Sequence, residues 1–301
     1  EKKMLLLQQM CVFLIIMFLG YFLAKKGKLD EHTTDNVSWI VVNVCNPCLI
    51  LSGAFGEKIS KDVVFLSLKV AVVVYIILLI VGLLMPFILG CRKNKVYSIM
   101  TVFGNIGFMG FPIIEAMYGK DALIFVTIFN IMFNVLMYTY GIMVISGSGF
   151  KMENIKKLFN IGIIACVIEL ILYFGNINLP YAAVNCISMI SNLTAPLSML
   201  VIGTTFVGMS VKSIIKDIRL ISFSIIRLVV IPLALFPLLN MMVKDATLLG
   251  VSVIMLTVPV ANMTVLIARQ YKGDYEIASR GVALTTVLSV VTMPLIFMLL
   301  L

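Results

Sequence analysis

Apolar residues form ten long runs along the chain, and short polar segments separate them. Each run is about 20 residues or longer, the length of helix that crosses roughly 30 Å of hydrocarbon. The apolar residues are continuous within each run and do not alternate with polar ones, so the pattern predicts membrane-spanning helices rather than barrel strands. The ten predicted spans, with boundaries good to a few residues, are 4–24, 36–56, 62–90, 95–118, 121–146, 155–175, 181–210, 217–241, 246–270 and 276–301.

The composition agrees with this pattern. The chain of 301 residues is 61% hydrophobic and 12% charged, with a mean hydropathy of +1.13. A soluble domain of this size could not cover its surface with so few charged side chains. We therefore expect a multi-pass protein of the cell membrane, with the lipid bilayer as its surroundings.

Lysine and arginine are distributed unequally between the two sets of loops. One side carries six of them, and the other carries fifteen, including Lys25, Arg92, Lys156, Lys216 and Arg269. Because positive charge collects on the cytoplasmic side, both termini are predicted to be extracytoplasmic. The net charge of +9 thus mainly reflects the basic residues that set the orientation of the spans in the membrane. A nucleic-acid partner is not expected, since the charges are spread over short loops.

The sequence offers little material for catalysis or for a cofactor. Cys45 and Cys48 have the spacing of a redox pair, but they lie inside a predicted span, where packing is the favoured role. The single histidine, His32, lies in a loop, and no phosphate-binding or dinucleotide-binding motif is present. We therefore expect no enzyme, no ATP-driven pump, no cofactor and no metal site.

The prolines indicate an internal repeat. Three prolines of the first half recur in the second half at offsets of 149, 146 and 147 residues: Pro47 with Pro196, Pro86 with Pro232 and Pro112 with Pro259. Chance could explain any one pair, but three nearly constant offsets favour a repeat. A repeat of five spans has an odd number of crossings, so residues 151–301 would run inverted relative to residues 1–150. Inverted repeats are typical of secondary transporters.

The fourth span contains the poorest helix formers of the chain, in the stretch GNIGFMGFP at 104–112. Its three glycines, Gly104, Gly107 and Gly110, lower the cost of an unwound backbone. Pro112 lacks an N–H group, and its ring clashes with the carbonyl four residues earlier. The pattern predicts a broken helix in this span.

The ninth span has the corresponding break at Pro259, followed by Val260 and Asn262. Freed backbone groups must face protein or water, so two broken helices from inverted copies would meet near the midplane. The half-helix N-termini would carry partial positive charge that suits an anion. Kinks without a binding site are the alternative, because Gly and Pro are common in membrane helices. The paired placement favours a site.

Asparagines are the polar candidates near these breaks. Asn105 lies in the broken stretch and Asn46 in the second span, while Asn130 and Asn134 share one face of the fifth span. Buried asparagines also form hydrogen bonds between membrane helices, so a purely structural role stays open for each of them.

Charged residues within the spans have several interpretations. Arg227 in the eighth span could compensate a carboxylate or anchor to loop carbonyls, and the structural role is favoured. Glu169 and Lys69 lie near enough to span ends to reach the surface. No pair of midplane aspartates is present, which argues against a sodium–proton antiporter built on paired carboxylates.

Four segments carry a resemblance to a known family: GNIGFMGFPIIEAMYG at 104–119, NPCLILSGAF at 46–55, RLVVIP at 227–232 and the stretch 258–295. Over essentially its whole length the chain resembles a prokaryotic member of the auxin efflux carrier family, distantly similar to the plant PIN auxin carriers. It lacks the long cytoplasmic loop that separates spans five and six in long plant carriers.

The resemblance implies an all-α membrane fold like that of sodium/proton antiporters and bile-acid symporters, with ten helices in two inverted five-helix repeats. Helices 1, 2, 6 and 7 would form a scaffold that could also make a homodimer. Helices 3–5 and 8–10 would form the moving domain of an elevator. The crossed helices 4 and 9 would hold the substrate, with Pro112 and Pro259 as crossover prolines and Asn105 as the first ligand.

The predicted function is secondary transport of a small organic anion, either auxin-like or a mono- or dicarboxylate such as malate. The predicted substrate-binding residues are Asn105, Gly107, Gly110, Pro112, Pro259, Val260, Asn262 and Asn46, with Asn130, Asn134, Thr257 and Arg227 as polar or ion support. The sequence leaves three possibilities open for the driving force: uniport down the substrate gradient, coupling to protons, or coupling to sodium. A ligand-sensing membrane module that keeps the transporter fold is the alternative.

Overall fold

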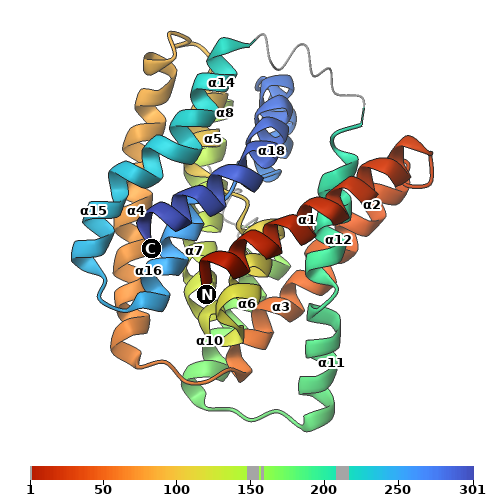
Figure 1. Ribbon diagram of the computed structural model, residues 1–301, viewed down its shortest axis with the longest axis vertical. Helices are drawn as coiled ribbons and strands as arrows, with labels where there is room; N and C mark the ends of the chain where they lie inside the picture. The colour runs from red at the N-terminus through yellow and green to blue at the C-terminus, as the bar shows by residue number, and fades with distance from the viewer. Residues whose placement is uncertain (1, 148–155, 157–158, 208–216) are drawn as a thin grey trace. The chain divides into compact units, whose positions relative to one another are not determined.

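The computed structural model describes residues 2–147, 156, 159–207 and 217–301. These residues form helices joined by short loops, with a single isolated β-bridge and no strand among them. Parts of the predicted spans (155, 157–158 and 208–210), and the basic loop residues Lys151, Lys157, Lys212 and Lys216, lie outside the described residues. Figure 1 shows the helices, and the η labels below mark short 3₁₀ or π helices.

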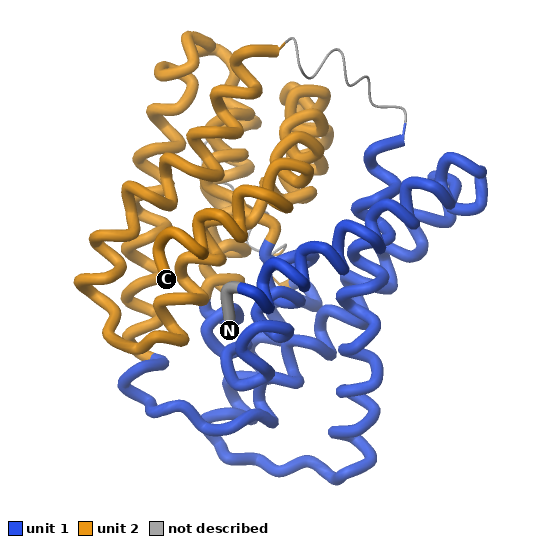
Figure 2. Tube along the Cα trace, in the orientation of Figure 1, with its two compact units in different colours: residues 1–64, 106–128, 160–209 blue, residues 65–105, 129–159, 210–301 orange. Residues whose placement is uncertain are grey.

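The chain divides into two compact units, coloured separately in Figure 2. Unit 1 comprises 1–64, 106–128 and 160–209. Its helices are α1 (Lys2–Lys25), α2 (Glu31–Ile40), η1 (Val41–Cys45), α3 (Asn46–Ser52), η2 (Gly53–Phe55), η3 (Ile106–Gly110), α6 (Phe111–Tyr118), η4 (Lys120–Ala122), α10 (Ile161–Gly175), α11 (Tyr181–Ser191) and α12 (Thr194–Thr204).

Unit 2 comprises 65–105, 129–159 and 210–301. Its helices are α5 (Val96–Val102), η5 (Met137–Gly141), α8 (Ile142–Ser146), α14 (Ile218–Ile225), η6 (Ile226–Val230), α15 (Ile231–Met242), α16 (Ala246–Thr257), α17 (Met263–Gln270) and α18 (Tyr275–Leu300). Two further helices, α4 (Lys61–Ile88) and α7 (Leu123–Leu136), begin in unit 1 and continue in unit 2.

Seven helical segments of the described chain are long and apolar enough to cross a membrane: 4–25, 31–55, 61–88, 120–146, 181–204, 218–242 and 275–300. Each coincides with a predicted span. The other three predicted spans contain shorter helices, because α10 has 15 residues and the fourth and ninth spans are interrupted. The all-helical membrane architecture is thus confirmed, whereas ten crossings in two inverted repeats stay a prediction.

The interruption in the fourth span lies at 103–105, between α5 and η3, where Phe103 is extended. Pro112, the last residue of the predicted broken stretch, lies beyond this interruption, in α6, and is buried there. The chain is already helical before this proline, because η3 leads directly into α6 through Gly110 in helical conformation. Pro112 therefore leaves a carbonyl of the preceding turn without its usual donor but does not interrupt the helix. In the ninth span the break does contain Pro259, between Val258 at the end of α16 and the start of α17.

In unit 1, α1 and α12 pack closely through glycines, as the crossing in Figure 1 shows. A side chain at Gly20 would strike the backbone carbonyl of Leu200, and one at Gly203 would strike that of Met17. Small residues allow such close approach between membrane helices, where no hydrophobic force drives association. The two glycines therefore fix the contact between these helices.

In unit 2, the first halves of the two broken helices form the centre. Every residue of α5 is buried, and so is α16 from Leu248 to Thr257. A helix that is buried all round belongs to the core. The long helix α18 packs against both of them, while α4 carries exposed apolar residues such as Ile80 and Phe87, as expected of a lipid-facing surface. The breaks are therefore positioned by the most buried part of this unit.

Candidate functional site

The two interrupted segments of unit 2 pair with each other. The Asn105 N–H donates to the carbonyl oxygen of Pro259 at 2.7 Å, and the Ala261 N–H donates to that of Phe103 at 3.0 Å. Gly104 and Val260 thereby form an antiparallel bridge. Backbone groups freed at lipid depth must be satisfied within the protein. We call residues 103–105 and 258–262 the crossover. Each of these two segments supplies hydrogen-bond partners for backbone groups of the other.

Gly104 is required by the closeness of this pairing. A Cβ atom at Gly104 would lie 2.6 Å from Cγ2 of Val258 and 3.1 Å from Nη2 of Arg227. Both neighbours are fully buried, so neither can move aside into solvent. The glycine is present here because the other backbone and a guanidinium occupy the space of a side chain.

Arg227 joins the crossover from the π helix η6. Its Nη1 donates to the carbonyl oxygen of Leu256 at 2.6 Å, in the last turn of α16. A positive charge is favourable at the C-terminal end of a helix, where carbonyls lack intrahelical partners. Among the described residues no carboxylate lies within ion-pair distance of this guanidinium. Of the two predicted roles, the structure shows the anchor to a carbonyl.

Two asparagines flank the paired backbones. Asn105 is only 4% exposed, in the segment that precedes η3. Asn262 is half-buried at the N-cap position of α17, and its side chain does not cap that helix. The antiparallel register places Asn105 beside Pro259 and Asn262 at the opposite end, after Ala261. An amide carries two donors and a carbonyl acceptor, so each end of the crossover has a group of the kind that recognises polar ligands.

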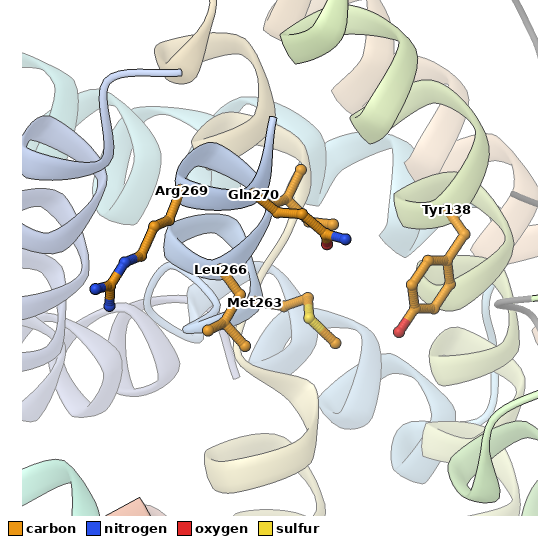
Figure 3. Close-up of a pocket in the computed structure, with 6 residues that line it drawn as sticks. Tyr138, Met263, Leu266, Arg269 and Gln270 are labelled. Atoms are coloured by element: carbon orange, nitrogen blue, oxygen red, sulfur yellow. The ribbon is translucent and has the colours of Figure 1, made fainter. Parts of the chain in front are cut away.

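A cavity of about 510 Å³ runs along α17, lined by Tyr138, Met263, Leu266, Ile267, Arg269 and Gln270. Figure 3 shows Met263 and Gln270 extending toward Tyr138 of η5, whereas the guanidinium of Arg269 points away from it. Met263 directly follows Asn262 in the chain, so one end of the cavity adjoins the crossover. The lining combines apolar side chains with a phenol and an amide, which is typical of small-molecule sites.

Comparison with known proteins decides the family. A family model described as "Membrane transport protein" matches residues 5–297. The chain belongs to this family, the auxin efflux carriers. It is 25% identical to an uncharacterized transporter of Methanocaldococcus jannaschii, over 94% of this chain and 95% of the relative. It is 23% identical to an uncharacterized transporter of Methanothermobacter thermautotrophicus, over 94% of each chain. It is also 23% identical to a putative malonate transporter of Rhizobium meliloti, over 93% of this chain and 91% of the relative.

The remaining predicted site residues of this auxin efflux carrier family member fall into two groups. Gly107, Gly110 and Pro112 lie in unit 1, in η3 and α6, together with Asn46. The amide nitrogen of Asn46 lies 3.0 Å from the place where Gly107 would carry a Cβ atom. The structure thus brings Asn46 to the glycine-rich stretch.

The predicted polar support in unit 2 is satisfied locally. The Asn134 amide donates to the backbone carbonyl of Asn130 at 2.8 Å, and both side chains are buried. The Thr257 hydroxyl donates to the carbonyl of Ile254 at 2.9 Å, within α16. These bonds lie within single helices, as is usual for polar residues at lipid depth.

One residue that supports the crossover was missed from the sequence. The Thr285 hydroxyl of α18 accepts a hydrogen bond from the Val260 N–H at 3.1 Å and donates to the Gly281 carbonyl at 2.7 Å. The spacing of Thr285 and Ser289 on one face of an apolar helix was the available signal. Sequence alone does not say which backbone such a hydroxyl reaches.

Two predictions about charged and thiol groups can be compared with the structure. Glu169 does not reach the surface, because its side chain is fully buried; that expectation was wrong. Lys69 is exposed on the protein surface, as expected. Cys45 and Cys48 are free thiols, buried and half-buried respectively.

Proposed function

We propose that this chain is a secondary transporter that binds a small organic anion at the crossover of its fourth and ninth helices. The observation that carries the proposal is the backbone pairing at 103–105 and 258–262, with the asparagines Asn105 and Asn262 beside it. In transporters built from inverted repeats, broken helices of this kind form the substrate site near the midplane of the membrane.

The electrostatics of the crossover favour an anion. The half-helix α17 begins directly after Asn262, so its N-terminal N–H groups add partial positive charge there. Arg227 adds a full positive charge beneath Gly104. A carboxylate is the common small ligand that accepts from N–H groups and amides. The name of the Rhizobium meliloti relative, a putative malonate transporter, fits this class, so we propose mono- or dicarboxylates, with auxin-like acids included.

The proposed mechanism is alternating access of the elevator type. Ten helices would form two inverted five-helix repeats, 1–150 and 151–301, with both termini outside the cell. Helices 3–5 and 8–10 would move with the substrate, and helices 1, 2, 6 and 7 would stay fixed and could pair in a homodimer. The membrane transport family supports transport itself, and the repeat supports the inversion.

A thermal-shift screen of organic acids on the purified protein, with and without sodium, tests the substrate class. A ligand that binds only the folded state at 100 times its Kd adds about 2.7 kcal/mol of stability. We expect malonate or a related carboxylate to raise the melting temperature, and the same acid to enter proteoliposomes that contain the protein.

Two results would contradict this proposal in different ways. If no organic acid stabilises the protein and none is transported, an organic anion is excluded as the substrate. Stabilisation without flux would instead favour a ligand-sensing module over a transporter.

A further inference from the structure

Unit 1 contains a carboxyl group that the proposed binding site does not use. Glu169 lies on α10, and its side chain is fully buried. One carboxyl oxygen, Oε2, accepts a short hydrogen bond from the Thr127 hydroxyl of α7. The other, Oε1, has no hydrogen-bond partner among the described residues. Half of this carboxyl is therefore unsatisfied inside a membrane-spanning protein.

The space around Oε1 is made by a glycine. A Cβ atom at Gly53 of η2 would collide with Oε1 and would also lie 2.9 Å from Cβ of Leu123. The helices packed against α10 are α3, η1 and η2. Together these elements enclose the carboxyl in an apolar setting.

No cation faces this carboxyl among the described residues. The titratable side chains on α10 and on the elements packed against it are the thiols of Cys166, Cys45 and Cys48 and the phenol of Tyr173. The short helix η4, which packs on η2, adds Asp121 and Lys120, and the Lys120 amine donates to the Ser188 hydroxyl at 2.6 Å. Lys58 donates to the Tyr173 carbonyl at 2.9 Å and lies over its ring. Its amine is thus engaged at the end of α10.

A carboxylate with one hydrogen bond and no cation is strongly disfavoured in a low-dielectric interior. A neutral carboxylic acid can occupy the same place, because it carries less charge to desolvate. A purely structural acid would be expected to use both of its oxygens. The buried position therefore favours the protonated form of Glu169. The proton can be released only in a conformation in which water reaches the carboxyl group.

We propose that Glu169 is a proton-binding site whose protonation changes during the transport cycle, so that anion transport by this chain is linked to protons. The inference rests on the proposed transport function. The proton comes from water and returns to water, and only the O–H bond of Glu169 forms and breaks. A proton carried with an anion cancels charge that would otherwise move against the membrane potential.

Tyr173 connects the end of α10 beyond Glu169 to an exposed loop. Tyr173 is four residues after Glu169, on the same face of the helix. Its hydroxyl accepts from the Ile59 N–H at 2.7 Å, in the loop that also contains the exposed Lys58. Loosening of this loop would admit water to the carboxyl.

The test uses the isosteric variant Glu169→Gln and the control Glu115→Gln. Glu115 is a second glutamate of unit 1, in α6, but it is only half-buried and has Lys120 nearby. Infrared spectra of the purified protein in lipid nanodiscs would detect a protonated carboxylic acid near neutral pH. We expect that band in the wild type and in Glu115→Gln, and its loss in Glu169→Gln.

Flux into proteoliposomes, with radiolabelled malonate as the probe, gives the second readout. We expect the wild-type rate and the Glu115→Gln rate to change with pH, and the Glu169→Gln rate to lose that dependence at an unchanged melting temperature. Absence of a Glu169-dependent acid band, or an unchanged pH profile in Glu169→Gln, would overturn the inference. A wild type that neither binds nor transports any of the organic acids in the screen would overturn the proposed function and the coupling with it, while the infrared band still decides whether Glu169 holds a proton.

Discussion

Gly104→Val is expected to abolish transport and to destabilise the protein. The new side chain would enter space held by Val258 Cγ2 at 2.6 Å and Arg227 Nη2 at 3.1 Å from its Cβ atom. Overpacking of a filled core costs about 1–3 kcal/mol. Because the strain falls on the two paired backbones, we expect the bonds of Asn105 and Ala261 to break. Flux and thermal unfolding of the purified variant measure the two effects.

The matched control is Gly162→Val. Gly162 lies in the first turn of α10, half-exposed, and a Cβ atom there would meet only the end of the Asn160 side chain at 3.1 Å. Displacing that side chain would cost at most its N-cap bond to the Ile163 N–H, so this variant should keep its flux. If Gly104→Val transported at the wild-type rate, the close crossover described above would not be needed for function.

Arg227→Met is expected to lower anion flux by at least about tenfold, equivalent to about 1.4 kcal/mol, with little loss of stability. Methionine leaves the Leu256 carbonyl without its donor, which costs about 1–3 kcal/mol. It also removes a buried charge that has no carboxylate partner among the described residues, and such removal is often stabilising by about 1–4 kcal/mol. The two contributions offset, so the melting temperature should stay near that of the wild type or rise.

Flux would still fall, because the positive charge beneath the crossover is lost. Arg227→Lys keeps a charge on a shorter, differently shaped group, and should retain part of the flux. A large fall in melting temperature with Arg227→Met, matched by the fall in flux, would assign Arg227 to folding alone. Flux measured alongside thermal unfolding for both variants separates these roles.

The sequence predicted the spans because the length of an apolar run depends only on bilayer thickness. It also located the break in the ninth span at Pro259, where the missing N–H leaves a carbonyl without its donor. A proline alone does not decide a break, since Pro86, Pro237 and Pro294 lie inside continuous helices. The broken stretch of the fourth span was predicted over 104–112, and the interruption lies at its beginning, at 103–105. The glycines allow unwinding along the whole stretch, and the choice of 103–105 depends on pairing with 258–262.

The tertiary contacts of the buried polar groups could not be predicted. Glu169 lies a turn and a half from the end of α10, and distance along a helix does not reveal which way a side chain points. The Thr285 contact with Val260 depends on how α18 packs on the crossover. Arg227 was recognised as either a counter-charge or an anchor, and only the Leu256 carbonyl identifies the contact it makes.

The most direct test of the proposed crossover site is the flux of radiolabelled malonate into proteoliposomes that contain the Asn105→Ala variant. The crossover bond of Asn105 uses its backbone N–H, so alanine should leave the pairing and the melting temperature intact. The control is Asn240→Ala, at an exposed asparagine of α15 in the same unit. A hydrogen bond to a charged ligand contributes about 1.5–3 kcal/mol, so we predict at least about a tenfold loss of flux in Asn105→Ala and none in Asn240→Ala. Wild-type flux in a folded Asn105→Ala variant would contradict the proposed site.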